Sequence, residues 1–243
     1  MQEFFSGIGD SLYKLLIVEN RWEMLLEGLG ITLFIALIST ILGTVLGFLV
    51  GIVRSTYDLQ LKGKKCRKFS DYLLKVLDVV ARIYVTVIRG TPVMVQIMIM
   101  FFVVFATAQD GVFPAILTFG INSGAYVAEI MRSGIMSIDK GQFEASRSIG
   151  FDYKRTMIYI ILPQAIKNIL PALGNEFIVL LKETSVACYV SVQELTFTGN
   201  MIASRTYDIF TSLIAVAAIY LVVVLVISYL LKLLERRLHN SDH

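Results

Sequence analysis

Residues 31–53 read ITLFIALISTILGTVLGFLVGIV, a run of 23 residues without a charge. The hydrocarbon core of a bilayer is about 30 Å thick, so a helix needs about 20 mostly apolar residues to cross it. This run therefore predicts a transmembrane helix. Gly43, Gly47 and Gly51 recur in it at every fourth position. Such a stripe of small residues lets a second helix approach closely, but glycine is also simply tolerated in membrane helices.

Four further stretches predict transmembrane helices, at about residues 91–107, 112–131, 157–181 and 209–231. The chain is 56% hydrophobic and only 17% charged, whereas about 25% of the residues of a soluble domain are charged. We therefore expect an all-α membrane protein with about five transmembrane helices.

Residues 70–90 are a mixed segment, in which apolar residues alternate with Lys75, Asp78 and Arg82. Because charges inside a bilayer are costly, an interfacial or partly inserted helix is favoured over a spanning one. If this segment crossed the membrane in addition to the others, there would be six spans and the C-terminal tail would lie on the opposite side.

The residues before the first span predict an amphipathic helix. Within residues 1–24, apolar side chains recur on one helical face at Phe5, Ile8, Leu12 and Leu15. We expect this segment to lie in the extracytoplasmic membrane interface. It lacks the basic start and the small-residue cleavage site of a signal peptide.

Basic residues are concentrated in three segments. Residues 54–90, residues 132–156 and the stretch after residue 231 together hold 17 of the 22 Lys and Arg residues. With five spans, all three segments lie on one side of the membrane. Cytoplasmic loops carry an excess of Lys and Arg, so the sequence predicts a cytoplasmic C-terminus and an external N-terminus.

In the loop between the third and fourth expected spans, residues 142–149 predict a short amphipathic helix. Phe143 is apolar and Glu144 is charged. Gly150 is a typical residue at a helix end, and Asp152 is a typical N-cap for the next helix. Such a helix either docks in a groove of a soluble partner or only covers the end of the bundle.

Glu144, Ala145 and Ser146 are followed after three residues by Gly150, and after nine more by an I-x-L-P segment at residues 160–163. This pattern resembles the signature E-A-A, three residues, G, nine residues, I-x-L-P of permease subunits of binding-protein-dependent ABC importers, with Ser146 in place of the second alanine. The resemblance implies the type I ABC importer permease fold, in which this loop is the cytoplasmic coupling helix that contacts an ATPase subunit. It assigns that contact to Gly141, Phe143, Glu144, Ala145, Ser146, Arg147 and Gly150.

Other segments resemble the polar amino acid branch of this family. They are RGTPVMVQ at 89–96, AYVAEIMR at 125–132, GQFEA at 141–145, LPALGNE at 170–176 and KETS at 182–185. The resemblance covers roughly residues 25–235, which implies one transmembrane domain there and a cytoplasmic tail at 236–243. The connection at 56–75 is longer and more basic than is usual in the family, so the resemblance implies nothing for it.

The resemblance also implies partners: ABC ATPase subunits that use ATP and Mg²⁺, an extracytoplasmic amino-acid-binding protein, and a second permease that is identical or similar. The setting is the plasma (inner) membrane of a prokaryote. The chain has no G-x-x-x-x-G-K-[ST] phosphate-binding loop, so we expect it to be no enzyme and to bind no cofactor itself. Cys66 and Cys188 lack metal-ligand spacing, so no metal site is expected, and neither is a nucleic-acid partner.

Charged residues inside spans are candidates for the substrate pathway, because burying them is costly. Glu176 lies beyond Pro171 in the fourth span, where its carboxylate would either receive a substrate ammonium or guanidinium group or be satisfied by another helix. Glu129 and Arg132 are three residues apart, so they form either a structural ion pair or part of the pathway. Polar residues within or at the ends of spans complete the predicted pathway: Gln96, Asn122, Ser123, Thr184 and Ser185.

Two other functions stay open. A secondary transporter driven by an ion gradient would show internal repeats with broken helices at corresponding positions, and no such repeat is visible in this sequence. A membrane scaffold that transports nothing would tolerate replacement of both Glu129 and Glu176 by glutamine.

Overall fold

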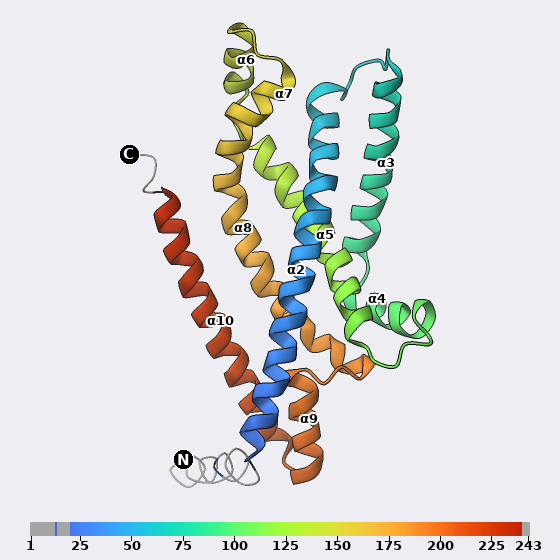
Figure 1. Ribbon diagram of the computed structural model, residues 1–243, viewed down its shortest axis with the longest axis vertical. Coiled ribbons are helices and arrows are strands. Elements are labelled where there is room, and N and C mark those ends of the chain that lie inside the picture. The colour runs from blue at the N-terminus through green and yellow to red at the C-terminus, as the bar shows by residue number, and fades with distance from the viewer. Residues whose placement is uncertain (1–12, 14–19, 240–243) are drawn as a thin grey trace. The chain divides into compact units, whose positions relative to one another are not determined.

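The computed structural model describes residue 13 and residues 20–239, so the predicted amphipathic face at residues 5–15 lies outside the described residues. All secondary-structure elements in the described part are helical, which confirms the predicted all-α class (Figure 1). They are α2 (Arg21–Gln60), α3 (Phe69–Gly90), α4 (Val93–Ile99), the π-helical η2 (Met100–Val104), α5 (Val112–Met136), α6 (Lys140–Ser148), α7 (Tyr153–Thr156), the π-helical η3 (Met157–Ile161), α8 (Leu162–Glu183), the 3₁₀-helical η4 (Thr184–Val190), α9 (Leu195–Thr206) and α10 (Ile209–His239).

Three helical stretches are long and apolar enough to cross a membrane. They are Arg21–Gln60, Tyr153–Val190 and Ile209–Arg237, which contain the first, fourth and fifth predicted spans. The third predicted span lies within α5 as one continuous helix.

The second predicted span differs from the structure. Residues 93–104 form a helical stretch of only about 18 Å at 1.5 Å per residue, too short for a 30 Å hydrocarbon core. A 105° bend separates this stretch from α3. The bend has a local cause, because Pro92 has no N–H and disfavours helical backbone at the residue before it; Thr91 is extended, with φ −120° and ψ 144°.

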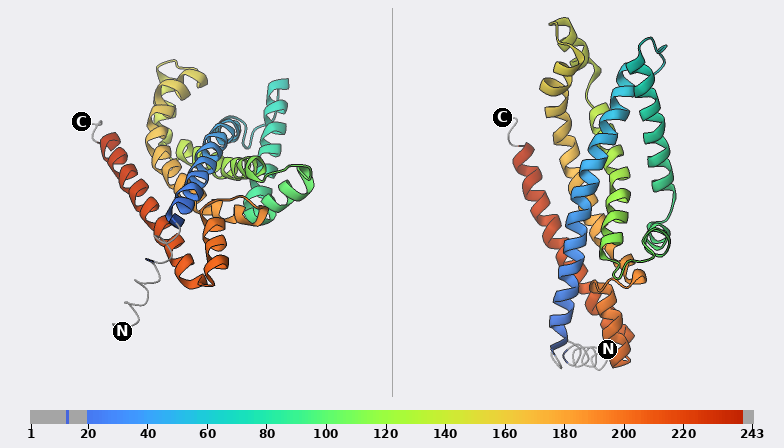
Figure 2. Two further views of the ribbon diagram at one scale, coloured as in Figure 1. Left: turned by 60° about the horizontal axis from the view of Figure 1, so that its bottom comes forward. Right: turned by 45° about the vertical axis from the view of Figure 1, so that its right-hand side comes forward.

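Helix α3 fits the second crossing better than residues 91–107 do. It has 22 residues, about 33 Å of helix, and it lies antiparallel beside the second half of α2 (Figures 1 and 2). Its exposed side chains are mostly apolar, including Val76, Val80 and Ile83. If α3 is the second crossing and α5 the third, the predicted number of five spans and the predicted side of the C-terminal tail are unchanged.

The helices fold into two compact units. The first contains residues up to 39, 93–119 and 178–230, and the second contains 40–92, 120–177 and those from 231 on. Some boundaries between the units fall within helices, so the long helices α2 and α5 each contribute one segment to each unit.

In the second unit, the glycine stripe of α2 packs directly against α5. A Cβ atom on Gly47 would lie 2.5 Å from Val127 Cβ and 2.8 Å from the Gly124 carbonyl oxygen, closer than real Cβ atoms approach. Gly43 and Gly51 meet Ser123 and Met131 in the same way. The interpretation of the stripe as a site of close helix approach is therefore confirmed.

In the first unit, a buried carboxylate caps α9. The Glu194 side chain accepts hydrogen bonds from the backbone N–H groups of Thr196 and Phe197, each at 2.8 Å, and from the Tyr220 hydroxyl at 3.1 Å. Glu194 is fully buried. Burial raises its pKa, and the hydrogen bonds oppose that rise.

We expect Glu194→Ala to destabilise the protein by about 1–3 kcal/mol, because it leaves two backbone donors of the cap without a partner. Glu194→Gln retains an acceptor oxygen and should cost less.

A carboxyl whose pKa is raised on folding stabilises the fold below its unfolded pKa and loses that contribution as the pH rises through the folded pKa. Because glutamine does not titrate, the melting temperature of Glu194→Gln in detergent should rise relative to that of wild type as the pH is raised above the ordinary carboxyl pKa; a difference that does not change with pH would contradict this.

Candidate functional site

The loop with the E-A-S sequence forms the predicted short helix, α6. It starts two residues earlier than expected, since the Asp139 side chain accepts a hydrogen bond from the Gly141 N–H and so caps its N-terminus. Gly150 follows its end with φ +88°, a conformation that favours glycine. Asp152 caps α7 as predicted, accepting from the Arg155 N–H at 2.7 Å.

Helix α6 has one face toward the bundle and one face exposed. Phe143 packs against the core of the second unit. Ser146 is 1% exposed, and its hydroxyl donates to the Phe143 carbonyl at 3.0 Å. Position 146 is buried, so it favours a small residue. The serine hydroxyl is satisfied there by a hydrogen bond within its own helix. The other predicted coupling residues are exposed: Gly141, Glu144, Ala145, Arg147 and Gly150.

A polar hollow of about 430 Å³ lies between α6 and the end of α2. Five charged residues line it: Asp58 from α2, Lys62 just after α2, and Lys140, Glu144 and Arg147 from α6. The carboxylate of Glu144 forms no hydrogen bond or ion pair with any residue that the structure describes. It is therefore available to a partner.

An ion-pair network joins α2, α3 and α5 in the second unit. The side chain of Asp58 is only 3% exposed and lies 3.1 Å from Arg82 and 3.3 Å from Arg132. Arg82 also donates to Asp78 at 2.7 Å. The partners of Asp58 are 24 and 74 residues away in the sequence, so no spacing rule predicts its buried ion pairs.

Glu129 belongs to the same network. Its carboxylate accepts from Arg132, the pairing that the sequence analysis proposed as one alternative, and also from Arg54 on α2. Arg54 is buried, and burying a guanidinium without a counter-charge is costly. The contacts therefore favour the structural ion pair for Glu129 over a direct role in binding substrate.

Two of the family-like segments meet in the second unit. The guanidinium of Arg89, in the RGTP segment, lies 5.0 Å from the ring centroid of Tyr126, in the AYVAE segment. Such cation–π contacts contribute about 0.5–2 kcal/mol. The Tyr84 hydroxyl of α3 also donates to the Ile121 carbonyl of α5, so α3 is fastened to α5 at two levels.

The predicted pathway residues are divided between the units. In the first, α4 with half-buried Gln96 packs against η4, which carries Thr184 and Ser185. Buried Thr184 donates to the Leu181 carbonyl at 2.7 Å, so its hydroxyl proton is already used within the helix.

In the second unit, half-buried Glu176 lies on α8, while Asn122 and Ser123 are buried on α5. The Ser123 hydroxyl has no hydrogen-bond partner among the described residues, and it faces Gly43. Its role in the pathway stays a prediction, because its present neighbour is a packed helix.

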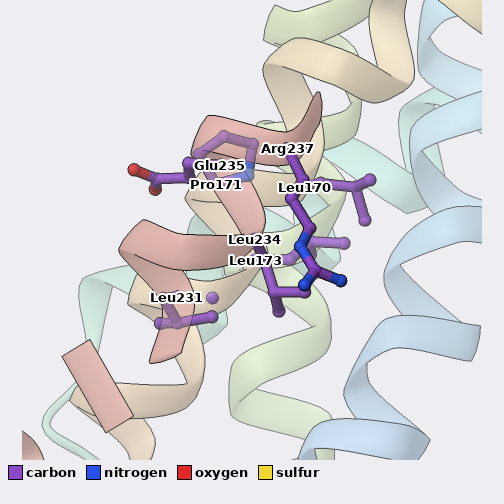
Figure 3. Close-up of a pocket in the computed structure, with 8 residues that line it drawn as sticks. Leu170, Pro171, Leu173, Leu231, Leu234, Glu235 and Arg237 are labelled. Atoms are coloured by element: carbon purple, nitrogen blue, oxygen red, sulfur yellow. The ribbon is translucent and has the colours of Figure 1, made fainter. Parts of the chain in front are cut away.

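An apolar groove lies between the second-unit parts of α8 and α10. It has a volume of about 540 Å³ and is lined by leucines, Pro171 and Gly174, with Glu235 and Arg237 as its charged members (Figure 3). Apart from these two charged residues the lining is apolar, and none of the predicted pathway residues lines the groove.

Comparison with known proteins gives the family. Residues 71–240 match the family described as "Binding-protein-dependent transport system inner membrane component". The glutamine transport system permease protein GlnP of Escherichia coli K12 is 36% identical over 88% of this chain and 93% of its own. The arginine transport system permease protein ArtQ of Bacillus subtilis is 35% identical over 90% of this chain and 94% of its own.

Solved structures share the fold. A chain from a crystal structure of an amino acid ABC transporter with histidines is 37% identical, with a TM-score of 0.80 over 92% of this chain and 98% of that one. A chain of the inward-facing MetNI methionine ABC transporter is 21% identical, with a TM-score of 0.72 over 90% and 98%, a likeness of fold alone. This chain belongs to the binding-protein-dependent transport system inner membrane components and is a permease of the ABC importer class.

Proposed function

We propose that this permease, paired with an identical or similar chain, imports a polar amino acid that an extracytoplasmic binding protein delivers. Separate ATPase subunits would drive the transport with ATP and Mg²⁺ through α6 around Glu144. The observation that carries this proposal is the geometry of α6. Phe143 packs against the core of the second unit and Ser146 is buried, while Glu144 and Arg147 are exposed beside a polar hollow.

This geometry suits the transmission of force. A helix whose apolar side is buried moves as a body with the helices on which it packs, while its exposed polar side remains free to dock in a partner's groove. The ion pairs of Asp58 and Glu129 add to this by tying α2, α3 and α5 together beside α6. Movement imposed on α6 would then reach several crossing helices at once.

The distribution of charge supports the proposed orientation. The α2–α3 loop, the α6–α7 region and the stretch after residue 231 hold most of the basic residues. With α3 as the second crossing, all three lie on one side of the membrane, which the positive-inside rule assigns to the cytoplasm. The ATPase subunits would then reach α6 from the side on which ATP is found.

The names of the relatives support an amino acid as the substrate. GlnP, ArtQ and the L-cystine permease TcyB of Bacillus subtilis are named for transport of glutamine, arginine and cystine. These substrates share an α-ammonium group, which needs an acceptor inside the pathway. We assign that acceptor to Glu176, the half-buried carboxylate of α8.

Glu176→Gln is expected to lower amino acid uptake roughly tenfold or more, because a charge-assisted hydrogen bond to the substrate is worth about 1.5–3 kcal/mol. Uptake of radiolabelled amino acids would be measured in proteoliposomes with the binding protein, the ATPase and ATP. Glu27→Gln, which neutralises an exposed carboxylate of α2, is the matched control. Unchanged uptake kinetics in Glu176→Gln would remove this residue from the site.

The same proteoliposomes test the proposed function itself. Uptake should require ATP and the binding protein and should persist when ion gradients are collapsed. Uptake that follows an imposed ion gradient without ATP would instead show a secondary transporter.

A further inference from the structure

The loop between α2 and α3 carries a basic cluster, of which only Lys62 also lines the hollow at the proposed coupling site. The cluster consists of Lys62, Lys64, Lys65, Arg67 and Lys68. Two carboxylates lie nearby in the sequence, and both are engaged elsewhere. Asp58 is buried against Arg82 and Arg132, and one oxygen of Asp71 accepts from the backbone N–H groups of Arg67 and Lys68 at 2.9 and 3.0 Å.

The positive charge of the basic cluster is therefore largely uncompensated. Only Lys62 approaches a carboxylate, that of Asp58 at 3.8 Å. Among the residues that the structure describes, no carboxylate oxygen lies within 4.0 Å of the side-chain nitrogens of the other four members. All of these charges are on exposed or half-exposed residues, open to an anionic partner.

The backbone holds this loop in a defined shape. Gly63 lies three residues beyond the end of α2 with φ +79°, and the Lys64 N–H donates to the Leu61 carbonyl at 2.9 Å. The bonds of Asp71 fix the start of α3. Between them lies a hollow of about 540 Å³, lined by Gln60, Leu61, Lys64, Lys65, Arg67, Lys68 and Asp71. Four of these seven lining residues are cationic, which suits a phosphate group.

An exposed apolar face continues directly from the basic cluster. Phe69 follows Lys68 and is 84% exposed. Tyr72, Leu73 and Val76 continue the same helical stripe, and all three are exposed. With α3 as a membrane crossing, this stripe meets acyl chains and the basic cluster lies at the level of the headgroups, where an anionic phospholipid matches both the charge of the loop and the apolar face beside it.

We propose that the basic cluster and the adjoining face of α3 bind anionic phospholipid of the membrane leaflet next to the loop. The phosphate headgroup occupies the basic hollow, and the acyl chains lie along the stripe that starts at Phe69. The basic hollow shares no lining residue with the hollow beside α6, which of the cluster only Lys62 lines, and it contains none of the predicted pathway residues.

The test uses a fluorescent reporter in the full-length protein. Trp22 is the single tryptophan of the chain, so Trp22→Phe combined with Phe69→Trp places one reporter at the proposed site. The protein is reconstituted in phosphatidylcholine vesicles that contain 10 mol%, roughly one lipid in ten, of a brominated quencher lipid. From the quenching of this tryptophan, brominated phosphatidylglycerol should bind near residue 69 at least about fivefold more strongly than brominated phosphatidylcholine. One Lys or Arg near an anionic surface contributes a factor of about this size.

Two charge variants decide where the preference arises. Replacing Lys64, Lys65, Arg67 and Lys68 by glutamine should abolish the preference for the anionic lipid. The matched control removes four exposed charges elsewhere, at Lys154, Arg155, Lys232 and Arg236, and should retain it. Equal quenching by both lipids in the reporter protein, or loss of the preference in both variants, would overturn the proposal. So would loss of a co-purifying protein from the first variant with lipid preference unchanged, which would assign the cluster to a protein partner.

Discussion

Glu144→Lys is expected to abolish ATP-driven uptake while the protein remains folded and inserted in the membrane. The carboxylate of Glu144 is exposed and makes no bond to the described part of the chain, so the fold loses nothing when it is replaced. A partner groove that accepts a carboxylate would instead meet an ammonium group, and a misplaced charge at an interface costs several kcal/mol. Uptake and co-purification of the ATPase would be measured on the same preparation.

Glu23→Lys makes the same change of charge at an exposed position in the first turn of α2. It should leave both uptake and ATPase association close to wild type. Normal uptake in Glu144→Lys would refute the assignment of α6 as the coupling helix, whereas equal loss in the two variants would point to a general effect of charge.

Gly47→Leu is expected to destabilise the protein by about 3 kcal/mol or more, the upper part of the range for overpacked cores. The new side chain would enter space held by Val127 Cβ and the Gly124 carbonyl oxygen, 2.5 and 2.8 Å from the first added atom. One of these neighbours is backbone, so α2 and α5 must separate for the side chain to fit. The melting temperature in detergent would be followed by fluorescence-detected size-exclusion chromatography.

Gly30→Leu is the matched control, since a Cβ at Gly30 meets nothing within 4 Å on the same helix. Here leucine should be neutral or stabilising by up to about 1 kcal/mol, because glycine is the poorer helix former. A Gly47→Leu protein as stable as Gly30→Leu would show that α2 and α5 do not pack as described.

The features that the sequence predicts correctly are those that local patterns specify. Apolar runs give the long helices, and the order of Glu144, Ser146 and Gly150 gives a short capped helix with one exposed face. The glycine stripe of α2 marks a close approach, although its partner α5 is not evident from the pattern.

The features that the sequence leaves out depend on contacts between distant segments. Asp58 meets Arg132, which is 74 residues away, and no periodicity connects them. In the sequence, Glu194 resembles an ordinary polar loop residue. In the structure its carboxylate caps α9 and accepts a hydrogen bond from the Tyr220 hydroxyl. The 105° bend between α3 and the helical stretch at residues 93–104 is not evident from hydropathy, although Pro92 lies at that point. The mixed charges of α3 obscured a full-length helix, since Asp78 and Arg82 are neutralised by ion pairs.

Affinity purification of the tagged protein from its native membrane, with ATP hydrolysis measured on the eluate, tests the central claim most directly. The proposal predicts that an ATPase subunit with a phosphate-binding loop co-purifies, that the eluate hydrolyses ATP, and that Glu144→Lys releases this subunit. If mild detergent and crosslinking both yield the permease without an ATPase, the coupling function assigned to α6 is wrong.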